Sequence, residues 1–184
     1  KLLMLGGILF ISLAVVSCGK KKKVVEPKPK NEVLIQEFCT GEEYFSDNKT
    51  FRATATGESS DRETAKKKAR SNANAEMAKT ISTTMKIVGD NYVNSTEFNN
   101  KEEITEPFNE MARTVIDQAI KICDKLTQKE DGRYVSYIAI ELSGDGIVSK
   151  YNERLSKDER IKADYNYEKF KETFEAEMQK LSEQ

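Results

Sequence analysis

The pattern of hydrophobic and polar positions predicts a strand followed by a long helix. Residues 51–57 alternate Phe, Ala and Gly with Arg and Thr, which is the period-two pattern of a strand with one buried face. Ser60 and Glu63 have the spacing of a capping box, so we expect the helix to begin there. One face of this helix repeats every four residues and changes from alanine to larger side chains: Ala65, Ala69, Ala73, Met77, Ile81 and Met85. Small residues on both surfaces predict that the helix lies close against the strand.

A second pair of strands is predicted in the C-terminal half. Residues 133–142 are rich in Tyr, Val and Ile and form the clearest strand pattern of the chain. The preceding Asp131-Gly132 is typical of a hairpin turn, which places the partner strand at residues 119–128. Residues 120–124 fit a strand, but a helical pattern also runs through Met111, Val115, Ala119, Ile122 and Leu126, so the boundary is open from sequence alone. We expect a helix or an irregular segment over 104–117, after an Asn-rich loop at 91–100.

Two more helices are predicted beyond these strands. Gly144-Asp145-Gly146 ends the strand, and the apolar positions between Ile147 and Leu155 fit a short helix. Ser156 and Glu159 form a second capping box, from which we expect the last helix to begin. Its apolar stripe contains Tyr167, Phe170, Phe174, Met178 and Leu181. Such a stripe is usually core, although a helix extending past the sheet would present it to a partner.

The N-terminal segment has the pattern of an export signal. Residues 2–16 are apolar or small, a run that is short for a bilayer span but suited to the core of a signal peptide. The run ends in Val15-Val16-Ser17-Cys18, which resembles the lipobox of bacterial lipoproteins. We therefore expect residues 1–17 to be removed and Cys18 to carry lipid, with palmitate-like acyl chains holding the protein on a membrane. The alternatives are an ordinary secretory signal with an incidental cysteine, or a membrane-spanning anchor.

Residues 18–32 are rich in lysine and proline and are expected to form an extended tether. Lys20, Lys21, Lys22 and Lys23 would lie at the lipid headgroups, where each adds about 1 kcal/mol of attraction to anionic lipid. The other interpretation is that these lysines only keep the arm solvated. No acidic residue follows Cys18 directly, which favours an outer-membrane location facing the periplasm over the cell surface.

Composition disfavours most catalytic and nucleic-acid-binding functions. The chain has 30 basic and 31 acidic residues, a net charge of -1 and no histidine. Without imidazole there is no Ser-His or Cys-His pair and no His-bearing zinc or haem site, so we expect neither an enzyme nor a metal or other cofactor. Lys66, Lys67, Lys68 and Arg70 form a basic helix face, which we interpret as solvated because no aromatic residues interleave to stack bases. We expect no nucleic-acid partner.

Two cysteines remain after the lipidated one, Cys39 and Cys123. Thiols exported into an oxidising compartment commonly pair, so a disulfide between them is predicted. Spacing alone does not show that their Cα atoms come within reach of each other, and two separate buried thiols are the alternative.

Together these features resemble the LPP-twenty family of bacterial envelope lipoproteins. The segments that carry the resemblance are residues 51–57, the alanines Ala65, Ala69, Ala73 and Ala75, and residues 131–135. The resemblance implies an α+β domain, here residues 33–184, with a long Ala-rich helix packed on a small antiparallel sheet and a C-terminal helix added. It implies a domain similar to those of flagellar outer-membrane accessory lipoproteins, and it carries over no catalytic residues.

Three classes of function follow from the sequence. The favoured one is a membrane-anchored, non-catalytic envelope component that acts structurally or in assembly and contacts other envelope proteins through a sheet edge or a helical stripe. The second is a periplasmic or surface binding module for a small ligand or glycan, which requires a concave pocket with convergent polar groups. The third is a hydrolase, which requires clustered carboxylates or an activated serine in a cleft.

Overall fold

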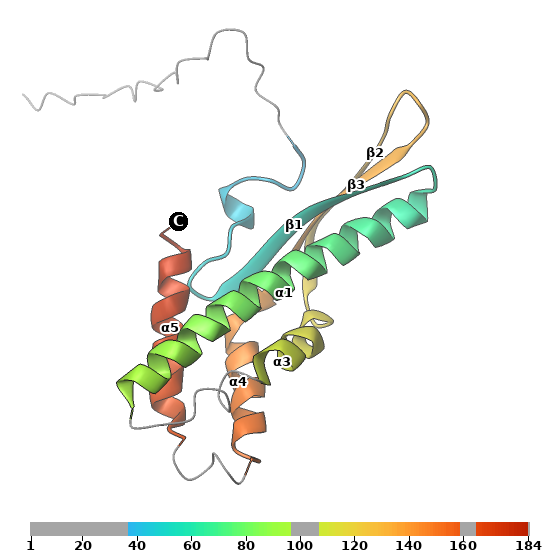
Figure 1. Ribbon diagram of the computed structural model, residues 1–184. Helices are drawn as coiled ribbons and strands as arrows, with labels where there is room; N and C mark the ends of the chain where they lie inside the picture. Colours follow the sequence, from blue (N-terminus) through green and yellow to red (C-terminus); the bar gives the residue numbers. More distant parts are fainter. Residues whose placement is uncertain (1–36, 97–106, 159–164, 184) are drawn as a thin grey trace, which may run out of the picture. The chain divides into compact units, whose positions relative to one another are not determined.

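Three antiparallel strands form the sheet, in the order β1-β3-β2: β1 is Thr50–Ser59, β2 is Ile120–Gln128 and β3 is Tyr134–Ser143. The computed structural model describes residues 37–96, 107–158 and 165–183 (Figure 1). A short 3-10 helix, η1 (Glu42–Tyr44), precedes the sheet. Four helices complete these parts of the chain: α1 (Arg62–Ser95), α3 (Pro107–Ile116), α4 (Gly144–Leu155) and α5 (Tyr167–Leu181). The structure thus confirms the predicted α+β fold, with a long helix on an antiparallel sheet and a C-terminal helix.

The close contact between α1 and β1 is as the sequence predicted. All six positions of the four-residue repeat, from Ala65 to Met85, are fully buried. Across from them, Phe51, Ala53 and Gly57 lie on the buried face of β1. A Cβ atom at Gly57 would lie 2.3 Å from the backbone nitrogen of Ala69 and 2.4 Å from the carbonyl oxygen of Ala65. Only glycine allows the helix to approach the strand this closely.

The second half of the core is aromatic and joins the C-terminal half of α1 to α4 and α5. The ring of Phe170 stacks on that of Tyr151 at 4.6 Å and meets Tyr92 edge-on at 5.5 Å. Phe174 packs against Phe51, at a distance of 6.3 Å between ring centroids. The apolar stripe of α5 therefore belongs to the core, and its central members Phe170, Phe174 and Met178 are buried.

Helix α1 begins within residues 60–63 as predicted, but its cap and its end differ from the prediction. The N-cap is Asp61, whose carboxylate accepts a hydrogen bond from the Thr64 backbone nitrogen at 2.7 Å, so the helix does not begin from the Ser60 capping box. At the other end the helix continues to Ser95, through residues predicted as an Asn-rich loop. Tyr92 is fully buried among the aromatic rings, and this burial outweighs the weak helix propensity of the neighbouring asparagines. Residues 97–100 of the predicted loop lie outside the described residues.

The second capping box is also wrong. Ser156 is the C-cap of α4, and its hydroxyl donates to the Glu153 carbonyl oxygen. The last helix begins at Tyr167, after Asn166, whose side-chain oxygen accepts from the Lys169 backbone nitrogen at 3.0 Å. Glu159 lies outside the described residues.

The hairpin is confirmed, and the ambiguity before it is resolved in favour of a strand. Ile120–Gln128 pairs with β3, with an irregularity between Lys121 and Cys123. Gly132 adopts a left-handed φ of 84° in the turn, which glycine allows without strain. Upstream, α3 covers Pro107–Ile116, and residues 104–106 lie outside the described part. The strand ends at Ser143 as predicted, but α4 begins directly at Gly144.

Candidate functional site

A disulfide joins Cys39 to Cys123, with their Cα atoms 5.7 Å apart. Cys123 lies on β2, opposite Ala139 of β3, and the Cys39 sulfur lies 3.6 Å from the Tyr137 carbonyl oxygen. Phe38 packs edge-on against the Tyr137 ring at 5.4 Å. The segment before η1 is therefore held against the face of the sheet opposite α1.

The free edge of β1 is closed by hydrogen bonds. The Arg52 backbone nitrogen donates to the Ser46 hydroxyl at 2.9 Å, and that hydroxyl donates back to the Arg52 carbonyl oxygen at 3.2 Å. From α1, the Asn72 amide donates to the Thr56 carbonyl oxygen at 2.8 Å, and Lys68 donates to the Glu58 carbonyl oxygen at 3.1 Å. These contacts occupy backbone groups that a further strand would need.

An ion-pair network reinforces this closed edge. The Arg52 guanidinium lies 2.7 Å from Glu141 and 2.8 Å from Asp47, and it also donates to the Phe45 carbonyl oxygen. Partial burial alone would lower the pKa of Arg52, but its hydrogen bond to Glu141 and the charge of Asp47 outweigh burial and raise the pKa. Partial burial would likewise raise the pKa of Asp47, but hydrogen bonds from Lys49 and Thr50 and the Arg52 charge lower it.

The free edge of β2 differs from that of β1. Within the described parts of the chain, no strand pairs with its outer side and no side chain bonds to its backbone. Three of its apolar side chains are exposed: Ile120 (60%), Ile122 (36%) and Leu126 (37%). We refer to the outer side of Ile120–Gln128, with these three side chains, as the β2 edge. Exposed apolar side chains beside unpaired backbone groups are the features by which one strand recruits another.

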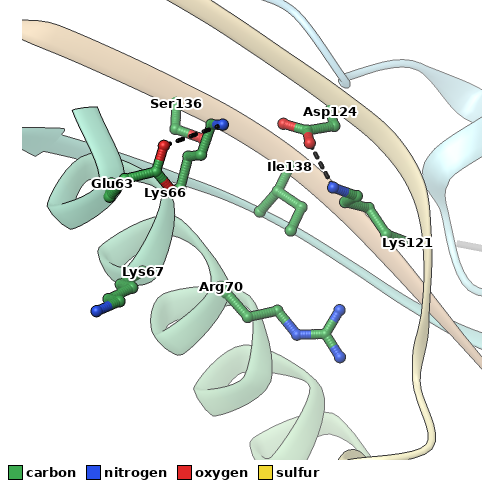
Figure 2. Close-up of a pocket in the computed structure, with 8 residues that line it drawn as sticks. All are labelled: Glu63, Lys66, Lys67, Arg70, Lys121, Asp124, Ser136 and Ile138. Atoms are coloured by element: carbon green, nitrogen blue, oxygen red, sulfur yellow. Dashed lines mark hydrogen bonds and ion pairs between the residues drawn. The ribbon is translucent and has the colours of Figure 1, made fainter.

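A shallow cleft of about 280 Å³ lies between the start of α1 and β2 (Figure 2). We refer to it as the α1–β2 cleft. It is lined by Glu63, Lys66, Lys67, Arg70, Lys121, Asp124, Ser136 and Ile138. The helix supplies the first four from successive turns of one face, and β3 supplies Ser136 and Ile138 between the two walls.

The cleft exists because α1 packs over β1 and β3 and leaves the same face of β2 uncovered. The register places Lys121 opposite Ile140 and Asp124 opposite Ile138, so both side chains are on the face of the sheet that α1 covers. Leu126, opposite the buried Ser136, is also on this face. The helix alone does not bury them, and the side-chain exposures of Lys121 and Asp124 are 49% and 36%.

The charges of the α1–β2 cleft are unbalanced. Four cationic and two anionic residues line the cleft, a net charge of +2, and one of the cations, Lys67, points away from it. Lys66 pairs with Glu63 at 3.6 Å, Lys121 pairs with Asp124, and Arg70 donates to the Ala119 carbonyl oxygen at 2.8 Å. Figure 2 shows Lys66 extending above Ser136 and Arg70 extending toward β2, while Lys67 points away. The surface ion pairs are worth at most about 1 kcal/mol each, so an incoming acid can compete for these cations.

Other hollows lie at the opposite end of the sheet. A hollow of about 480 Å³ lies between the loop at Asn48, the start of α4 and one side of α5. Another, of about 270 Å³, lies beside Ile120 and Val115. In the described residues no group of three or more His, Cys, Asp or Glu side chains is placed to hold a metal ion. Ser136, the serine that lines the α1–β2 cleft, is 2% exposed.

Of the sequence-predicted site residues, the structure brings together Cys39 and Cys123. Cys18 and Lys20–Lys23 lie outside the described residues. The basic helix face is divided: Lys66, Lys67 and Arg70 line the cleft, whereas Lys68 bonds to β1. The β2 edge was not identified from sequence, because the alternation of residues 119–128 predicts a strand but not its position in the sheet.

Comparison with known proteins finds no match, whether to a protein-family model, to a curated protein or to a solved structure. Among the described helices, none is both long enough and apolar enough to cross a bilayer.

Proposed function

We propose that this protein is a bacterial envelope lipoprotein, held by lipid on Cys18 at the periplasmic face of the outer membrane, that acts through contacts with other proteins and not as a catalyst. The observation that carries the contact role is the contrast between the two edges of its sheet. The edge of β1 is closed by side chains from Ser46, Lys68 and Asn72. The edge of β2 exposes three apolar side chains, and its outer backbone has no partner among the residues that the structure describes.

Edge strands are usually protected, since an exposed one recruits other chains. Here side chains bond to the outer backbone of β1, whereas within the described residues none bonds to the outer backbone of β2. That selectivity supports a functional edge at β2. The Cys39–Cys123 disulfide supports export, because such bonds persist in oxidising compartments and are rare in the cytosol.

The anchoring part of the proposal is tested by comparing the wild-type chain with Cys18→Ala in bacterial cells. We expect the wild-type protein in the membrane fraction, with acyl chains on Cys18 found by mass spectrometry of the extracted N-terminus. The Cys18→Ala variant should be unacylated and should leave the outer membrane. An unmodified Cys18 in membrane-extracted wild-type protein contradicts this part.

The contact part is tested by photo-crosslinking in intact cells. A photoreactive amino acid at Lys125, on β2, is compared with the same group at Glu153, an exposed position of α4. We expect discrete higher-mass products from position 125 and none from position 153. Absence of products at position 125, with the variant folded and present at wild-type level, contradicts the contact role.

A further inference from the structure

We propose that the occupant of the β2 edge is an extended segment of another protein, alternately acidic and apolar, which adds to the sheet as a fourth strand with its acidic side chains over the α1–β2 cleft. This inference rests on the proposed contact function and names the chemistry of the partner.

The backbone of β2 explains why the occupant is a strand. Its inner side pairs with β3 from Ile120 to Gln128, apart from the irregularity between Lys121 and Cys123, and its outer side is unpaired among the described residues. A segment that pairs there satisfies its own backbone groups and those of β2 together. The disulfide at Cys123 holds β2 to the segment before η1, so the edge is held in place before a partner arrives.

The face of the sheet explains why alternate side chains are acidic. In an added strand every second side chain lies on the α1 side, beside Lys121, Asp124 and Leu126, and the Asp124 carboxylate is already paired with Lys121. The cleft on that side carries a net charge of +2, and Lys66 and Arg70 extend over it from the helix. Glutamate or aspartate on the α1 side of the added strand would lie near these cations. Lysine or arginine there would be disfavoured by like-charge repulsion.

The opposite face explains why the remaining side chains are apolar. Ile120, opposite Glu141, is on the face away from α1 and is 60% exposed, and Lys125, opposite Tyr137, is on the same face. Phe38, also exposed, lies over this face against Tyr137. An apolar side chain of the added strand covers such groups and gains roughly 25 cal/mol for each Å² removed from water.

A second copy of this chain fits the β2 edge less well. Strand β2 carries Lys121 and Lys125 against one acid, Asp124, and the cleft beside it is also positive. Pairing β2 with itself brings two surfaces of the same charge together. An acidic segment relieves this charge imbalance, whereas a second copy doubles it.

The test uses the full chain and three synthetic peptides of nine residues. The first alternates Val and Glu, the second alternates Val and Lys, and the third repeats the first with alternate backbone nitrogens methylated on one edge. Binding is measured by fluorescence anisotropy at low salt, and protection of β2 amides by hydrogen exchange. We expect the Val-Glu peptide to bind and to slow exchange at the β2 edge. The Val-Lys peptide should bind at least tenfold more weakly, and methylation of the pairing edge should abolish binding.

Matched protein variants locate the acid contacts. We expect Lys66→Gln combined with Arg70→Gln to weaken Val-Glu binding by about tenfold, which corresponds to about 1.4 kcal/mol. Lys86→Gln, at an exposed position of α1 outside the cleft lining, should leave binding unchanged. Equal loss in both variants would show only a diffuse charge effect and would overturn the assigned role of the cleft.

Other outcomes also overturn the inference. Equal binding of the methylated peptide excludes strand addition, and no binding of the Val-Glu peptide at millimolar concentration excludes the acidic partner. If sedimentation analysis showed a dimer, and Lys125→Glu changed the fraction of dimer, the β2 edge would be assigned to a second copy. In each of these cases crosslinks from position 125 in cells would still support the contact function. Failure of the strand-addition inference can therefore be distinguished from failure of the proposed function.

Discussion

Gly57 shows how one residue determines the distance between two elements. The added Cβ of any other side chain would lie within 2.4 Å of two backbone atoms of α1, and backbone atoms cannot move aside as a flexible side chain can. The alternation of residues 51–57 predicted that this glycine faces the helix. The small residues of both elements also predicted a close approach, but not that a Cβ at residue 57 would meet two backbone atoms of α1.

Gly57→Ala is expected to destabilise the domain by at least about 3 kcal/mol, because α1 must move away from β1. The matched control is Gly146→Ala in α4, where an added Cβ meets nothing within 4 Å. That change should stabilise the fold by roughly 0.5 to 1 kcal/mol through helix propensity. Urea denaturation of both variants measures the two free energies of unfolding, and equal small effects would contradict the close contact.

Asp47 gives a pH-dependent contribution to stability. The hydrogen bonds and the Arg52 charge that outweigh its partial burial hold its pKa below that of the unfolded chain. Its stabilisation is therefore complete above the unfolded pKa of about 3.9 and is lost as the pH falls through the lower, folded-state pKa. We expect the stability difference between the wild type and Asp47→Asn to be constant near neutral pH and to shrink below about pH 4. Urea titrations across this range measure it, and a difference that grows on acidification would contradict the depressed pKa.

At the scale of elements, the sequence predicted these helices, but their N-caps are residues other than the predicted ones. Both Ser-x-x-Glu patterns were candidate caps, and neither starts a helix in the structure. At α1 the cap lies one residue later, on Asp61, and at α5 it is Asn166. A capping box is a local signal, whereas the position at which a helix ends depends on distant residues. The burial of Leu155 extends α4 up to Ser156, and the buried rings of Tyr92 and Phe170 determine where α5 starts.

Asn166→Ala is expected to cost about 1 kcal/mol, because the Lys169 backbone nitrogen loses its acceptor. Ser156→Ala is the matched control. Among the described residues its exposed hydroxyl bonds to the Glu153 carbonyl oxygen alone, so stability should change by less than about 0.5 kcal/mol. Thermal and urea denaturation compare the two. If Ser156→Ala proved the more damaging change, the position of the α5 start would be wrong.

The order of the strands in the sheet could not be predicted from the sequence. Periodicity identified all three strands, and the turn at Asp131-Gly132 paired two of them. Which strands occupy the edges depends on the pairing of β1 with β3, across residues far apart in the chain. The β2 edge and the α1–β2 cleft follow from that pairing, and so neither was predicted.

At the scale of the whole molecule, the disulfide joins segments separated by 84 positions. A link across so long a loop restricts the unfolded chain, and by the chain-entropy relation it contributes about 4 to 5 kcal/mol. The sequence predicted that both cysteines lie in an exported domain, but their proximity follows from the three-dimensional course of the chain before η1.

We expect Cys39→Ser combined with Cys123→Ser to lower the free energy of unfolding by most of that amount, and hydrogen exchange in β2 to become faster. Reductant should lower the stability of the wild type to the level of the double variant and should leave the variant unchanged. An identical urea midpoint for oxidised wild type and double variant would contradict a stabilising bond.

The unequal edges of the sheet also determine how many molecules can assemble on it. A sheet that is open on both sides can be extended by one strand after another, and such growth leads to filaments. With Ser46, Lys68 and Asn72 occupying the edge of β1, extension here proceeds from one side only. A partner that donates a single strand would therefore form a complex of one-to-one stoichiometry that does not propagate.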